Sequence, residues 1–419
     1  MKYGLIGERL THSFSAEIHY LLGGYEYSLN EIEPSALGTF MKKRDFDGIN
    51  VTIPYKREVM KYLDSVSPQA EKIGAVNTVV NRGGKLYGYN TDFAGMSALI
   101  RRIGVGLSGR SVMIAGTGGT SATAAAVADS LGAAEIKLLS RRSSGGAVTY
   151  DRAAEECYGC SYLINTTPAG MYPNADAGLP LRLADFPQLA GVADAVYNPL
   201  RTGLVLASRD SGIPAEGGLY MLVAQAAAAS SLFTGAEYSD DAVNTVYEKI
   251  LSRRENAVLI GMSGSGKSYV GRLAAEKLGR RFIDTDSEIV RVTGKTVPEI
   301  FGSVGEQGFR EIESSVIDRV SQETGVVIAT GGGAVLKPEN VLSLRRNGRL
   351  FYLDRNPEKL ETGAGRPLAP DRESAIKLYR DRKSIYLAAA DVTVTVTEDD
   401  PYAAVNTVAG GYKNENTHY

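Results

Sequence analysis

Two glycine-rich turns, each placed directly after a short apolar run, constrain this sequence more than any other feature. The first is Gly116–Gly119, after the run Ser111–Ala115, and the second is Gly261–Ser268, after Ala257–Ile260. In both places a buried strand is expected to lead through glycines into the start of a helix. This geometry lets bare backbone N–H groups and the positive helix end approach a phosphate closely. We therefore expect two nucleotide-binding α/β units, one for a dinucleotide and one for a nucleoside triphosphate.

Length and charge narrow the class of protein. At 419 residues the chain is too long for one ordinary core, so two or three domains are expected. The apolar fraction of 43% is that of a globular protein, and the net charge of −2 implies neither nucleic acid nor a membrane surface as partner. The N-terminus shows no charged leader, and the alanine-rich run Val223–Leu232 is too short to span a bilayer. We expect a soluble cytoplasmic protein that acts on small molecules and has no obligate protein partner.

The two cysteines, Cys157 and Cys160, are spaced as C-x-x-C. This spacing fits a redox pair or half of a zinc site, but a zinc site needs two more ligands. The three histidines, His12, His19 and His418, lie far from the cysteines in sequence. Ordinary thiols in a reducing compartment are the favoured interpretation.

The apolar pattern divides the chain into three segments, which are residues 1–95, 96–214 and a second α/β unit from Ala257 onward. Strands are expected at Tyr3–Ile6, Tyr25–Glu31, Gly48–Val51, Ala75–Val80, Ser111–Ala115, Ile136–Leu139, 257–260, 326–330 and 349–353. Helices are expected at Ala94–Ile103, Ala122–Leu131, Leu219–Phe233 and Asp240–Ser252. The polar stretch Ser252–Asn256 is the expected linker, and the polar residues from Gly410 to Tyr419 are expected to be disordered.

The second glycine turn matches the phosphate-binding loop in full. Its pattern is Gly261-x4-Gly266-Lys267-Ser268, and Gly264 and Ser265 complete the loop. The loop amides should wrap the β-phosphate of ATP, Lys267 should reach the β and γ oxygens, and Ser268 should hold Mg²⁺.

Further polar residues follow this loop. Asp284 and Asp286 stand at the end of the next expected strand, where one carboxylate can serve the metal shell and the other can accept a hydrogen bond from a substrate hydroxyl. The alternative is that both are helix N-caps. The turn Gly331–Gly333 follows a buried strand, which indicates either a ligand against bare backbone or only a tight turn. The glycine-rich stretch Glu361–Leu368 contains Arg366, as a closing lid would need.

Taken together, these residues resemble shikimate kinase over nearly all of residues 257–400. The match runs through the phosphate loop, Asp284-x-Asp286, Phe309-Arg310-x-x-Glu313, Gly331-Gly332-Gly333, Arg366-Pro367-Leu368 and Arg382-x3-Tyr386. The resemblance implies that Asp286, Arg310, Gly331, Gly332, Gly333 and Arg382 hold shikimate. It also implies that Arg366 swings onto the ATP phosphates, that Asp284 belongs to the metal shell and that Asp286 orients the 3-hydroxyl.

The first glycine turn is a weaker signal by itself, but a strand precedes it and a helix follows it. The next strand ends at Ser140-Arg141-Arg142, where an enzyme that prefers NAD usually has an acid for the ribose 2′-hydroxyl. Two arginines suit a 2′-phosphate, so NADP is favoured over NAD. A solvated basic turn is the alternative.

Polar residues for a substrate come earlier in the chain. Asn50, Thr52 and Lys56 follow an apolar strand, and Asp92 stands at an expected helix start. A lysine beside an aspartate can pass a proton to or from a carbinol oxygen while a hydride moves at the same carbon. Taken singly, Lys56 also fits an ordinary surface lysine and Asp92 fits a helix cap.

As a set, residues 1–250 resemble shikimate dehydrogenase. The matching motifs are Ser13-Phe14-Ser15, Asn50-Val51-Thr52-x-Pro54-x-Lys56, Gly74-Ala75-x-Asn77-Thr78, Asn90-Thr91-Asp92, the glycine turn, Ile164-Asn165-x-Thr167-Pro168-x-Gly170-Met171, Tyr197-Asn198-Pro199 and Met221-Leu222-Val223-x-Gln225-Ala226. The resemblance implies that shikimate is held by Ser13, Ser15, Thr52, Asn77, Asp92, Tyr197 and Gln225. It implies that Lys56 and Asp92 are the catalytic pair, and that NADP(H) is held by Gly116, Gly118, Gly119, Thr120, Ser140, Arg141 and Gly218.

The sequence departs from the dehydrogenase pattern in three places. Ala16 stands where proline is common, and Ser140 stands where asparagine usually precedes the arginine. Only about two dozen residues separate Ser140 from Asn165, where the family usually fits a helix and another strand with more room. A trimmed NADP lobe is therefore expected.

These readings predict an α/β protein in which a two-lobed dehydrogenase precedes a P-loop kinase domain with a parallel sheet. The dehydrogenase would span residues 1–252, with a substrate lobe of 1–95 and 215–252 and a Rossmann NADP lobe of 96–214. The kinase domain would span 257–410, and a polar tail would span 411–419. The function expected is reduction of 3-dehydroshikimate with NADPH, followed by phosphorylation of shikimate with MgATP. The alternatives are a metabolite sensor without turnover, and a dehydrogenase that prefers quinate.

Overall fold

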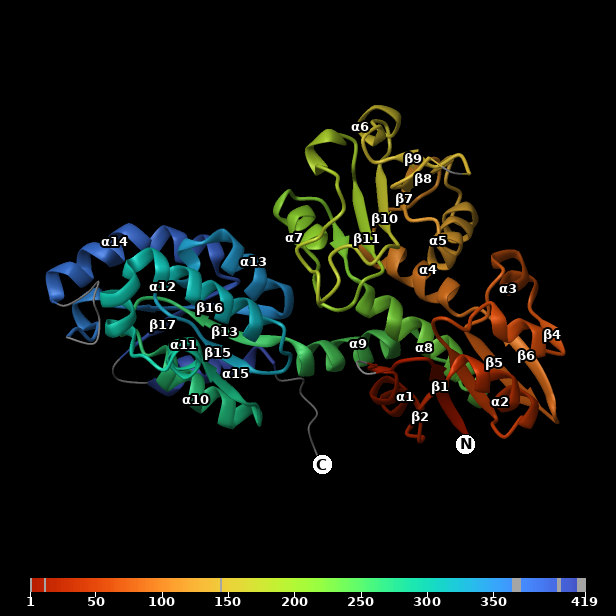
Figure 1. The fold of residues 1–419 in the computed structure, drawn as a ribbon, viewed down its shortest axis with the longest axis horizontal. Coiled ribbons are helices and arrows are strands. Elements are labelled where there is room, and N and C mark those ends of the chain that lie inside the picture. Colours follow the sequence, from red (N-terminus) through yellow and green to blue (C-terminus); the bar gives the residue numbers. More distant parts are fainter. Residues whose placement is uncertain (1, 11–12, 144, 364–370, 398–400, 413–419) are drawn as a thin grey trace. The chain divides into compact units, whose positions relative to one another are not determined.

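The computed structural model describes residues 2–10, 13–143, 145–363, 371–397 and 401–412. The chain divides into two compact units, Met1–Ile250 and Leu251–Tyr419. The first unit contains two six-stranded sheets, and the second contains one five-stranded sheet (Figure 1).

The first sheet of the first unit is mixed and has the strand order β2-β1-β3-β5-β6-β4. Its strands are β1 (Tyr3–Gly7), β2 (Ser28–Glu31), β3 (Gly48–Val51), β4 (Ser65–Val66), β5 (Thr78–Arg82) and β6 (Lys85–Tyr89). β1 pairs in parallel with β2 and β3, whereas β5 runs antiparallel to β3 and β6. The surrounding helices are α1 (Ser15–Gly23), η1 (Pro34–Ala36), α2 (Leu37–Lys43), η2 (Glu58–Tyr62) and α3 (Pro68–Ile73). Ile6, Ile49 and Val79 are buried on one face of the sheet. They belong to the same apolar cluster as residues of α2, η2 and α3.

The second sheet is parallel throughout, with the order β12-β11-β10-β7-β8-β9. Its strands are β7 (Ser111–Ala115), β8 (Glu135–Ser140), β9 (Val148–Thr149), β10 (Tyr162–Asn165), β11 (Gly191–Asp194) and β12 (Ala215–Glu216). The helices between them are α5 (Gly119–Ser130), α6 (Ala153–Glu156), η3 (Leu183–Asp185) and α7 (Gly203–Asp210). The strand order reverses between β7 and β10, as in the Rossmann fold, and ligands bind at the carboxyl ends of strands at such a switch point.

The short stretch between Ser140 and Asn165 still provides the third strand of a Rossmann half, β9, and the one-turn helix α6. Among the described residues between β8 and β9, no helix forms. The second sheet therefore has six strands, and the described residues between β8 and β9 connect these two strands without a helix.

Two longer helices complete the first unit, together with a third that extends past its last residue, Ile250. They are α4 (Asp92–Ile103), α8 (Gly218–Thr234) and α9 (Asp240–Arg254). α4 and α8 pack closely, because a Cβ on Gly95 would lie only 2.6 Å from the carbonyl oxygen of Met221. This contact places the start of α4, which carries Asp92, beside the middle of α8, which carries Gln225.

The second unit is built on a parallel sheet with the order β14-β15-β13-β16-β17. Its strands are β13 (Asn256–Ile260), β14 (Phe282–Asp284), β15 (Val327–Ala329), β16 (Gly348–Arg355) and β17 (Val392–Val396). Its helices are α10 (Lys267–Leu278), α11 (Thr285–Thr293), α12 (Val297–Ser321), η4 (Ala334–Leu336), α13 (Pro338–Asn347), η5 (Pro357–Lys359), α14 (Arg372–Ala389) and α15 (Pro401–Gly410). Apolar clusters cover both faces of the sheet, as a parallel sheet requires.

Two expectations about the ends of this unit were wrong. Ser252–Arg254 is the last turn of α9 instead of a linker, and β13 begins at Asn256. The Asn256 side chain is buried, where it donates to the Glu323 carbonyl and accepts from the Val326 N–H. Tyr412, expected in the polar tail, is also buried and donates to the Asn256 carbonyl. Residues 413–419 lie outside the described residues.

Two candidate active sites

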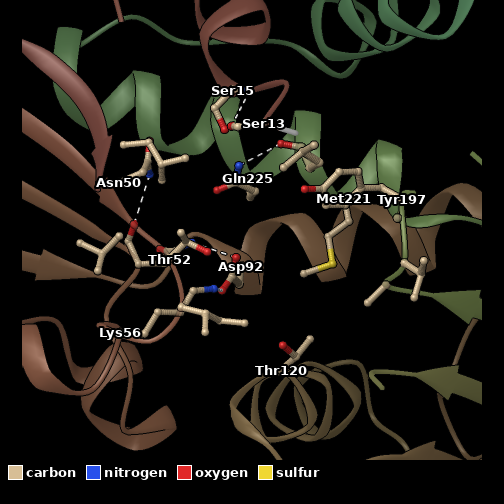
Figure 2. Close-up of a pocket in the computed structure, with 18 of the residues that line it drawn as sticks. Ser13, Ser15, Asn50, Thr52, Lys56, Asp92, Thr120, Tyr197, Met221 and Gln225 are labelled. Carbon is tan, nitrogen blue, oxygen red and sulfur yellow. Dashed lines mark hydrogen bonds and ion pairs between the residues drawn. The ribbon is translucent and has the colours of Figure 1, made fainter. Parts of the chain in front are cut away.

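A cleft of about 590 Å³ opens in the first unit. The cleft is lined by residues of the first sheet and by residues of the loops and helices that follow strands of the second sheet (Figure 2). The predicted site residues on its walls are Ser13, Ser15, Thr52, Lys56, Asn77, Asp92, Thr120, Tyr197, Gly218 and Gln225. Ten predicted residues, spread along the sequence from Ser13 to Gln225, therefore meet at one cavity.

Lys56 and Asp92 form an ion pair inside this cleft. The Lys56 Nζ lies 2.6 Å from Asp92 Oδ2, and the two side chains are 28% and 15% exposed. Asn77 Nδ2 donates to the other carboxylate oxygen, Oδ1, at 2.9 Å. The lysine ammonium and the carboxylate thus face the cavity while a neutral amide fixes the carboxylate (Figure 2).

A buried hydrogen-bond network holds Asn77 in turn. Its Oδ1 accepts from the Thr91 N–H at 2.7 Å and from the Thr78 hydroxyl at 3.0 Å. Asn50 Nδ2 donates to the Thr78 hydroxyl at 2.9 Å. The threonines belong to motifs identified in the sequence, but no role was predicted for them. Such supporting contacts depend on β5 and α4 meeting in space, which local spacing does not reveal.

The remaining polar wall residues come from three different elements. Ser13 and Ser15 lie at the start of α1, where the Ser15 N–H donates to the Ser13 Oγ at 3.2 Å. Gln225 on α8 accepts from the Thr91 hydroxyl at 3.4 Å. Tyr197 follows β11, and burial raises the pKa of its hydroxyl. These groups offer several hydroxyl and amide partners to a polyhydroxy ligand.

The glycine turn after β7 is shaped for a ligand rather than for packing at two of its positions. Gly116 has φ of 118°, and a Cβ there would lie 2.5 Å from the Thr166 Oγ1. A Cβ on Gly118 or Gly119 would meet no protein atom within 4 Å. These two glycines therefore leave bare backbone facing open space at the N-terminus of α5, which fits a dinucleotide phosphate.

The other predicted cofactor residues lie apart from the cleft wall. Ser140 ends β8 and Arg141 follows it with an exposed side chain. Neither lines the cleft, whereas Thr120 and Gly218 do. A ligand that reached from Arg141 to Gly218 would have to extend along the carboxyl edge of the second sheet, as a dinucleotide does in this fold.

The second unit presents the phosphate loop between β13 and α10. Gly261, Gly264 and Gly266 have φ of 142°, 79° and 95°, values that favour glycine. The Lys267 ammonium is buried and donates to the Gly261 and Met262 carbonyl oxygens at 2.9 and 2.7 Å. Ser265, within the loop, is fully buried. Internal hydrogen bonds therefore hold the loop, since its lysine side chain donates to the loop backbone.

Ser268 and Asp284 supply two oxygen donors beside this loop. The Ser268 hydroxyl donates to Asp284 Oδ2 at 2.6 Å, and Asp284 Oδ1 accepts from the Ser287 N–H at 3.0 Å. Asp284 therefore caps α11, as the alternative interpretation expected, and its other oxygen contacts Ser268 beside the phosphate loop. Mg²⁺ in nucleotide sites takes one or two protein oxygen ligands and completes its shell with water and phosphate, so this donor set fits the ion.

Four charged residues gather around the turn Gly331–Gly333. Burial, together with the nearby Asp284 charge, raises the pKa of Asp286. Arg310 Nη1 pairs with Glu313 Oε2 at 2.6 Å, and Arg382 Nη1 donates to the Gly332 carbonyl at 3.2 Å. The turn therefore lies between a carboxylate of raised basicity and two guanidinium groups.

A side chain on any glycine of that turn would approach a neighbouring group closely. A Cβ on Gly331 would lie 2.8 Å from Asp286 Oδ1, and a Cβ on Gly332 would lie 2.8 Å from the Ser263 backbone nitrogen. A Cβ on Gly333 would lie 2.1 Å from Arg310 Nη1. Arg366, the predicted lid arginine, lies outside the described residues.

The C-x-x-C cysteines lie in the core of the first unit. Cys157 and Cys160 are free and almost fully buried among apolar side chains. Among the described residues, no cluster of three potential ligands could hold a metal ion. Over the same part of the chain, every helix is too short or too polar to cross a membrane.

The two units match different families of known proteins. A family model described as shikimate dehydrogenase substrate binding domain matches residues 5–79, and one described as shikimate kinase matches residues 263–410. The shikimate dehydrogenase (NADP(+)) of Clostridium perfringens is 34% identical over 274 residues, which are 60% of this chain and 98% of the relative.

Solved structures match the first unit as well. Shikimate 5-dehydrogenase from Thermus thermophilus, in complex with NADP(H) and shikimate, matches with a TM-score of 0.53 at 29% identity, over 59% of this chain and 99% of that one. Quinate dehydrogenase from Corynebacterium glutamicum, in complex with NAD, matches with a TM-score of 0.54 at 27% identity, over 60% of this chain and 99% of that one. The chain thus belongs to the shikimate dehydrogenase family through its first unit and carries a shikimate kinase domain in its second.

Proposed function

We propose that this chain is a bifunctional enzyme of the shikimate pathway. The first unit reduces 3-dehydroshikimate to shikimate with NADPH, and the second transfers the γ-phosphoryl group of ATP to the shikimate 3-hydroxyl. The observation that carries the proposal is the presence, in one chain, of a cleft holding the Lys56–Asp92 pair and a phosphate loop holding Lys267 and Ser268.

In the first reaction Lys56 handles the proton. When bound, NADPH supplies the hydride that adds to the carbonyl carbon of 3-dehydroshikimate. The Lys56 ammonium donates a proton to the carbonyl oxygen, which becomes the 3-hydroxyl of shikimate. Asp92 holds the ammonium in place at 2.6 Å and also accepts a hydrogen bond from the substrate. In the reverse direction the neutral amine of Lys56 accepts the hydroxyl proton.

The cleft walls bind the rest of the substrate. Ser13 and Ser15 hold one end of the ring, and Thr52, Asn77, Tyr197 and Gln225 hold its hydroxyl groups. All six line the same cavity as the catalytic pair. Because each presents a neutral hydroxyl or amide, the wall selects a polyhydroxy ring by hydrogen bonding.

The second sheet holds the cofactor. Gly116, Gly118, Gly119 and Thr120 receive the pyrophosphate at the N-terminus of α5, and Gly218 receives the nicotinamide end. Ser140 and Arg141 bind the 2′-phosphate, so NADP is preferred over NAD. The support for this assignment is the open space above Gly118 and Gly119 and the exposed side chain of Arg141.

In the second reaction the phosphate loop holds ATP. Gly261, Gly264, Ser265 and Gly266 wrap the phosphates, and Lys267 leaves its backbone carbonyls to pair with the β and γ oxygens. Ser268 and Asp284 would hold Mg²⁺, which would neutralise phosphate charge. Arg366, which lies outside the described residues, is the proposed source of a further positive charge for the transferring γ-phosphoryl group.

Asp286 accepts the proton of the shikimate 3-hydroxyl as that oxygen forms its bond to the γ-phosphorus and ADP leaves. Its raised pKa makes it a better base than an exposed carboxylate. Arg310 and Arg382 bind the shikimate carboxylate, and Gly331, Gly332 and Gly333 let the ring approach the backbone.

The domain boundaries follow from these assignments. The dehydrogenase comprises residues 1–252, with a substrate lobe of 1–95 and 215–252 and an NADP lobe of 96–214, and the kinase comprises 257–410. A cytoplasmic location is part of the proposal and rests on the two free cysteines, because disulfides persist in oxidising compartments.

A quinate dehydrogenase is the second candidate for the first unit. It is favoured by the structural match to the quinate enzyme of Corynebacterium glutamicum. Quinate carries one more hydroxyl than shikimate, so the wall near Thr52 and Tyr197 decides between the two. A sensor without turnover is the remaining alternative.

The test offers the purified chain shikimate with NADP⁺, and separately shikimate with MgATP. Lys56→Ala should lower only the dehydrogenase activity, by about 10²–10⁴-fold. Lys267→Ala should lower only the kinase activity, by about 10²–10³-fold. Faster reduction of NADP⁺ with quinate than with shikimate would support the second candidate, and no turnover in either assay would support a sensor.

A further inference from the structure

A buried carboxylate, Asp194, occupies the end of β11 and had no role in the sequence analysis. Its Oδ1 accepts from Asn165 Nδ2 at 2.9 Å and from the Val196 N–H at 3.0 Å, and its Oδ2 accepts from the Thr202 hydroxyl at 2.6 Å. The side chain is fully buried. All three donors are neutral, and burial raises the pKa of Asp194 to about 7. A buried carboxyl that is bonded only to neutral donors lowers the free energy of unfolding. Such a residue is therefore a candidate for a functional role.

Asp194 joins two segments that both line the cleft. Asn165, at the end of β10, bonds to Asp194 through its amide nitrogen, and its Oδ1 accepts from the Thr167 N–H at 3.0 Å and hydroxyl at 2.7 Å. Residues 166–168 and 195–197 are cleft-wall residues in full. The Asp194 carboxylate, together with the backbone hydrogen bond from the Ala195 N–H to the Asn165 carbonyl, therefore links the wall segment after β10 to the wall segment after β11.

The same contacts extend to the cofactor residues. The Val196 carbonyl accepts from the Gly218 N–H at 2.9 Å, and a Cβ on Gly218 would lie 2.2 Å from the Ala195 carbonyl oxygen. On the other side, the Thr166 hydroxyl donates to the Ala115 carbonyl at 2.6 Å, just before the glycine turn. Asp194 lies between these two cofactor-facing edges.

We propose that Asp194 is a positioning residue of the dehydrogenase, which fixes segments 166–168 and 195–197 so that they hold the nicotinamide end of NADP beside Lys56. It acts through Asn165, Val196 and Thr202 and does not touch the substrate. The inference rests on the proposed dehydrogenase function.

The test is Asp194→Asn in the full chain, which keeps the size of the side chain. Its amide can no longer accept at every contact, so the two wall segments lose their fixed separation. A misplacement of about 1 Å can cost about 10²-fold in rate, so we expect kcat/KM for NADP⁺ to fall by about ten- to a hundredfold. The KM for NADP⁺ should rise, and the Kd of NADPH, from its fluorescence change on binding, should rise with it.

Controls separate positioning from folding. The kinase activity of the same chain should be unchanged. Asp129→Asn, at an exposed ion pair with Lys72, should leave all dehydrogenase constants unchanged. A purely structural role would reduce the active fraction, which lowers kcat but leaves the KM and the NADPH Kd unchanged, and that result overturns the proposal.

A second pair of variants serves if Asp194→Asn does not fold. Thr202→Val removes one of the three donors, and Thr202→Ser retains it. We expect a smaller rise in NADPH Kd for Thr202→Val and recovery for Thr202→Ser; equal Kd values for the two variants and wild type would contradict the proposal. Wild type that binds NADPH but does not oxidise shikimate would sink the proposed function alone, because the binding comparison would still stand.

Discussion

The two sites of this chain differ in the partners of their charged groups. In the first unit the Lys56 ammonium meets Asp92 at 2.6 Å, and Asn77 holds the carboxylate from its other side. In the second unit Lys267 bonds to carbonyl oxygens of its own loop, and Ser268 bonds to Asp284. The acid–base pair is therefore assembled in advance. In the proposed kinase, Lys267 instead has to exchange these hydrogen bonds for bonds to the phosphates of ATP.

The glycine turns show the same contrast in another form. Gly118 and Gly119 face open space, so their lack of a side chain leaves room for a ligand. Gly331, Gly332 and Gly333 face Asp286, the phosphate loop and Arg310, so their lack of a side chain serves the packing of the site itself. Two similar glycine motifs thus need glycine for different physical reasons.

Removal of divalent metal should separate the two activities most strongly. A chelator should abolish phosphorylation of shikimate, because Ser268 and Asp284 then have no ion to hold against the phosphates. Shikimate oxidation with NADP⁺ should be unchanged. Both rates would be followed on one sample before and after EDTA, with excess Mg²⁺ restoring the kinase. A dehydrogenase that also stopped would contradict the separation of the two sites.

Gly333→Ala tests the packed glycine turn. Its Cβ would push the Arg310 guanidinium away, since the two atoms would be 2.1 Å apart. We expect kcat/KM for shikimate in the kinase assay to fall by about 10²-fold, as for a displaced binding group. The dehydrogenase rate serves as the internal control, and normal kinase kinetics would show that Arg310 does not need that space.

Gly118→Ala tests the open glycine turn. The added methyl meets no protein atom within 4 Å, so the melting temperature should be unchanged. It should hinder the pyrophosphate and raise the KM for NADP⁺ by about tenfold, or about 1.4 kcal/mol. A large loss of stability with unchanged KM would mean that Gly118, like Gly333, serves packing.

The smallest effect concerns the pH dependence of stability. Burial lowers the pKa of His19 to about 3 from 6.5, because the buried ring is favoured in its neutral form. The stability that the neutral ring contributes is therefore complete above about pH 6.5 and is lost as pH falls towards 3. Asp194 changes the stability in the opposite direction. Its raised pKa means that the folded state favours the protonated carboxyl, so the first unit loses stability as pH rises through about 7. The second unit has no histidine among its described residues.

His19→Gln isolates the histidine from Asp194. In urea unfolding of the first unit, wild type should lose up to about 1.36 kcal/mol per pH unit more than the variant below about pH 6. The transition of the second unit should be the same in both proteins. Parallel pH profiles for wild type and His19→Gln would indicate that His19 takes up its proton at the same pH in the folded and unfolded states, which contradicts a lowered pKa.

Much of the fold was predictable, because strands such as β3 and β7 are short apolar runs bounded by turn residues, and they match the expected ranges in full. The structure of the expected linker was not predictable. Asn256 is polar, yet its side chain is buried and forms hydrogen bonds with Glu323 and Val326, which lie about seventy residues away. Local sequence carries no record of such distant partners.

The candidate sites divide in the same way. Lys56 and Asp92 were predicted through family motifs, and the structure places them in contact, although 36 residues separate them. Asp194 was missed because a single aspartate after an apolar run reads as an ordinary strand end. Only the meeting of β10, β11 and the start of α7 reveals its three donors.

The central claim is that one chain carries out two consecutive reactions, and a coupled assay tests it most directly. Purified protein would receive 3-dehydroshikimate, NADPH and MgATP, and products would be followed by mass spectrometry. The account predicts shikimate 3-phosphate from wild type, unreacted 3-dehydroshikimate from Lys56→Ala, and accumulated shikimate from Lys267→Ala. An equimolar mixture of the two variants should restore the final product. Failure of wild type to form shikimate 3-phosphate, or formation of it by either variant alone, would contradict the account.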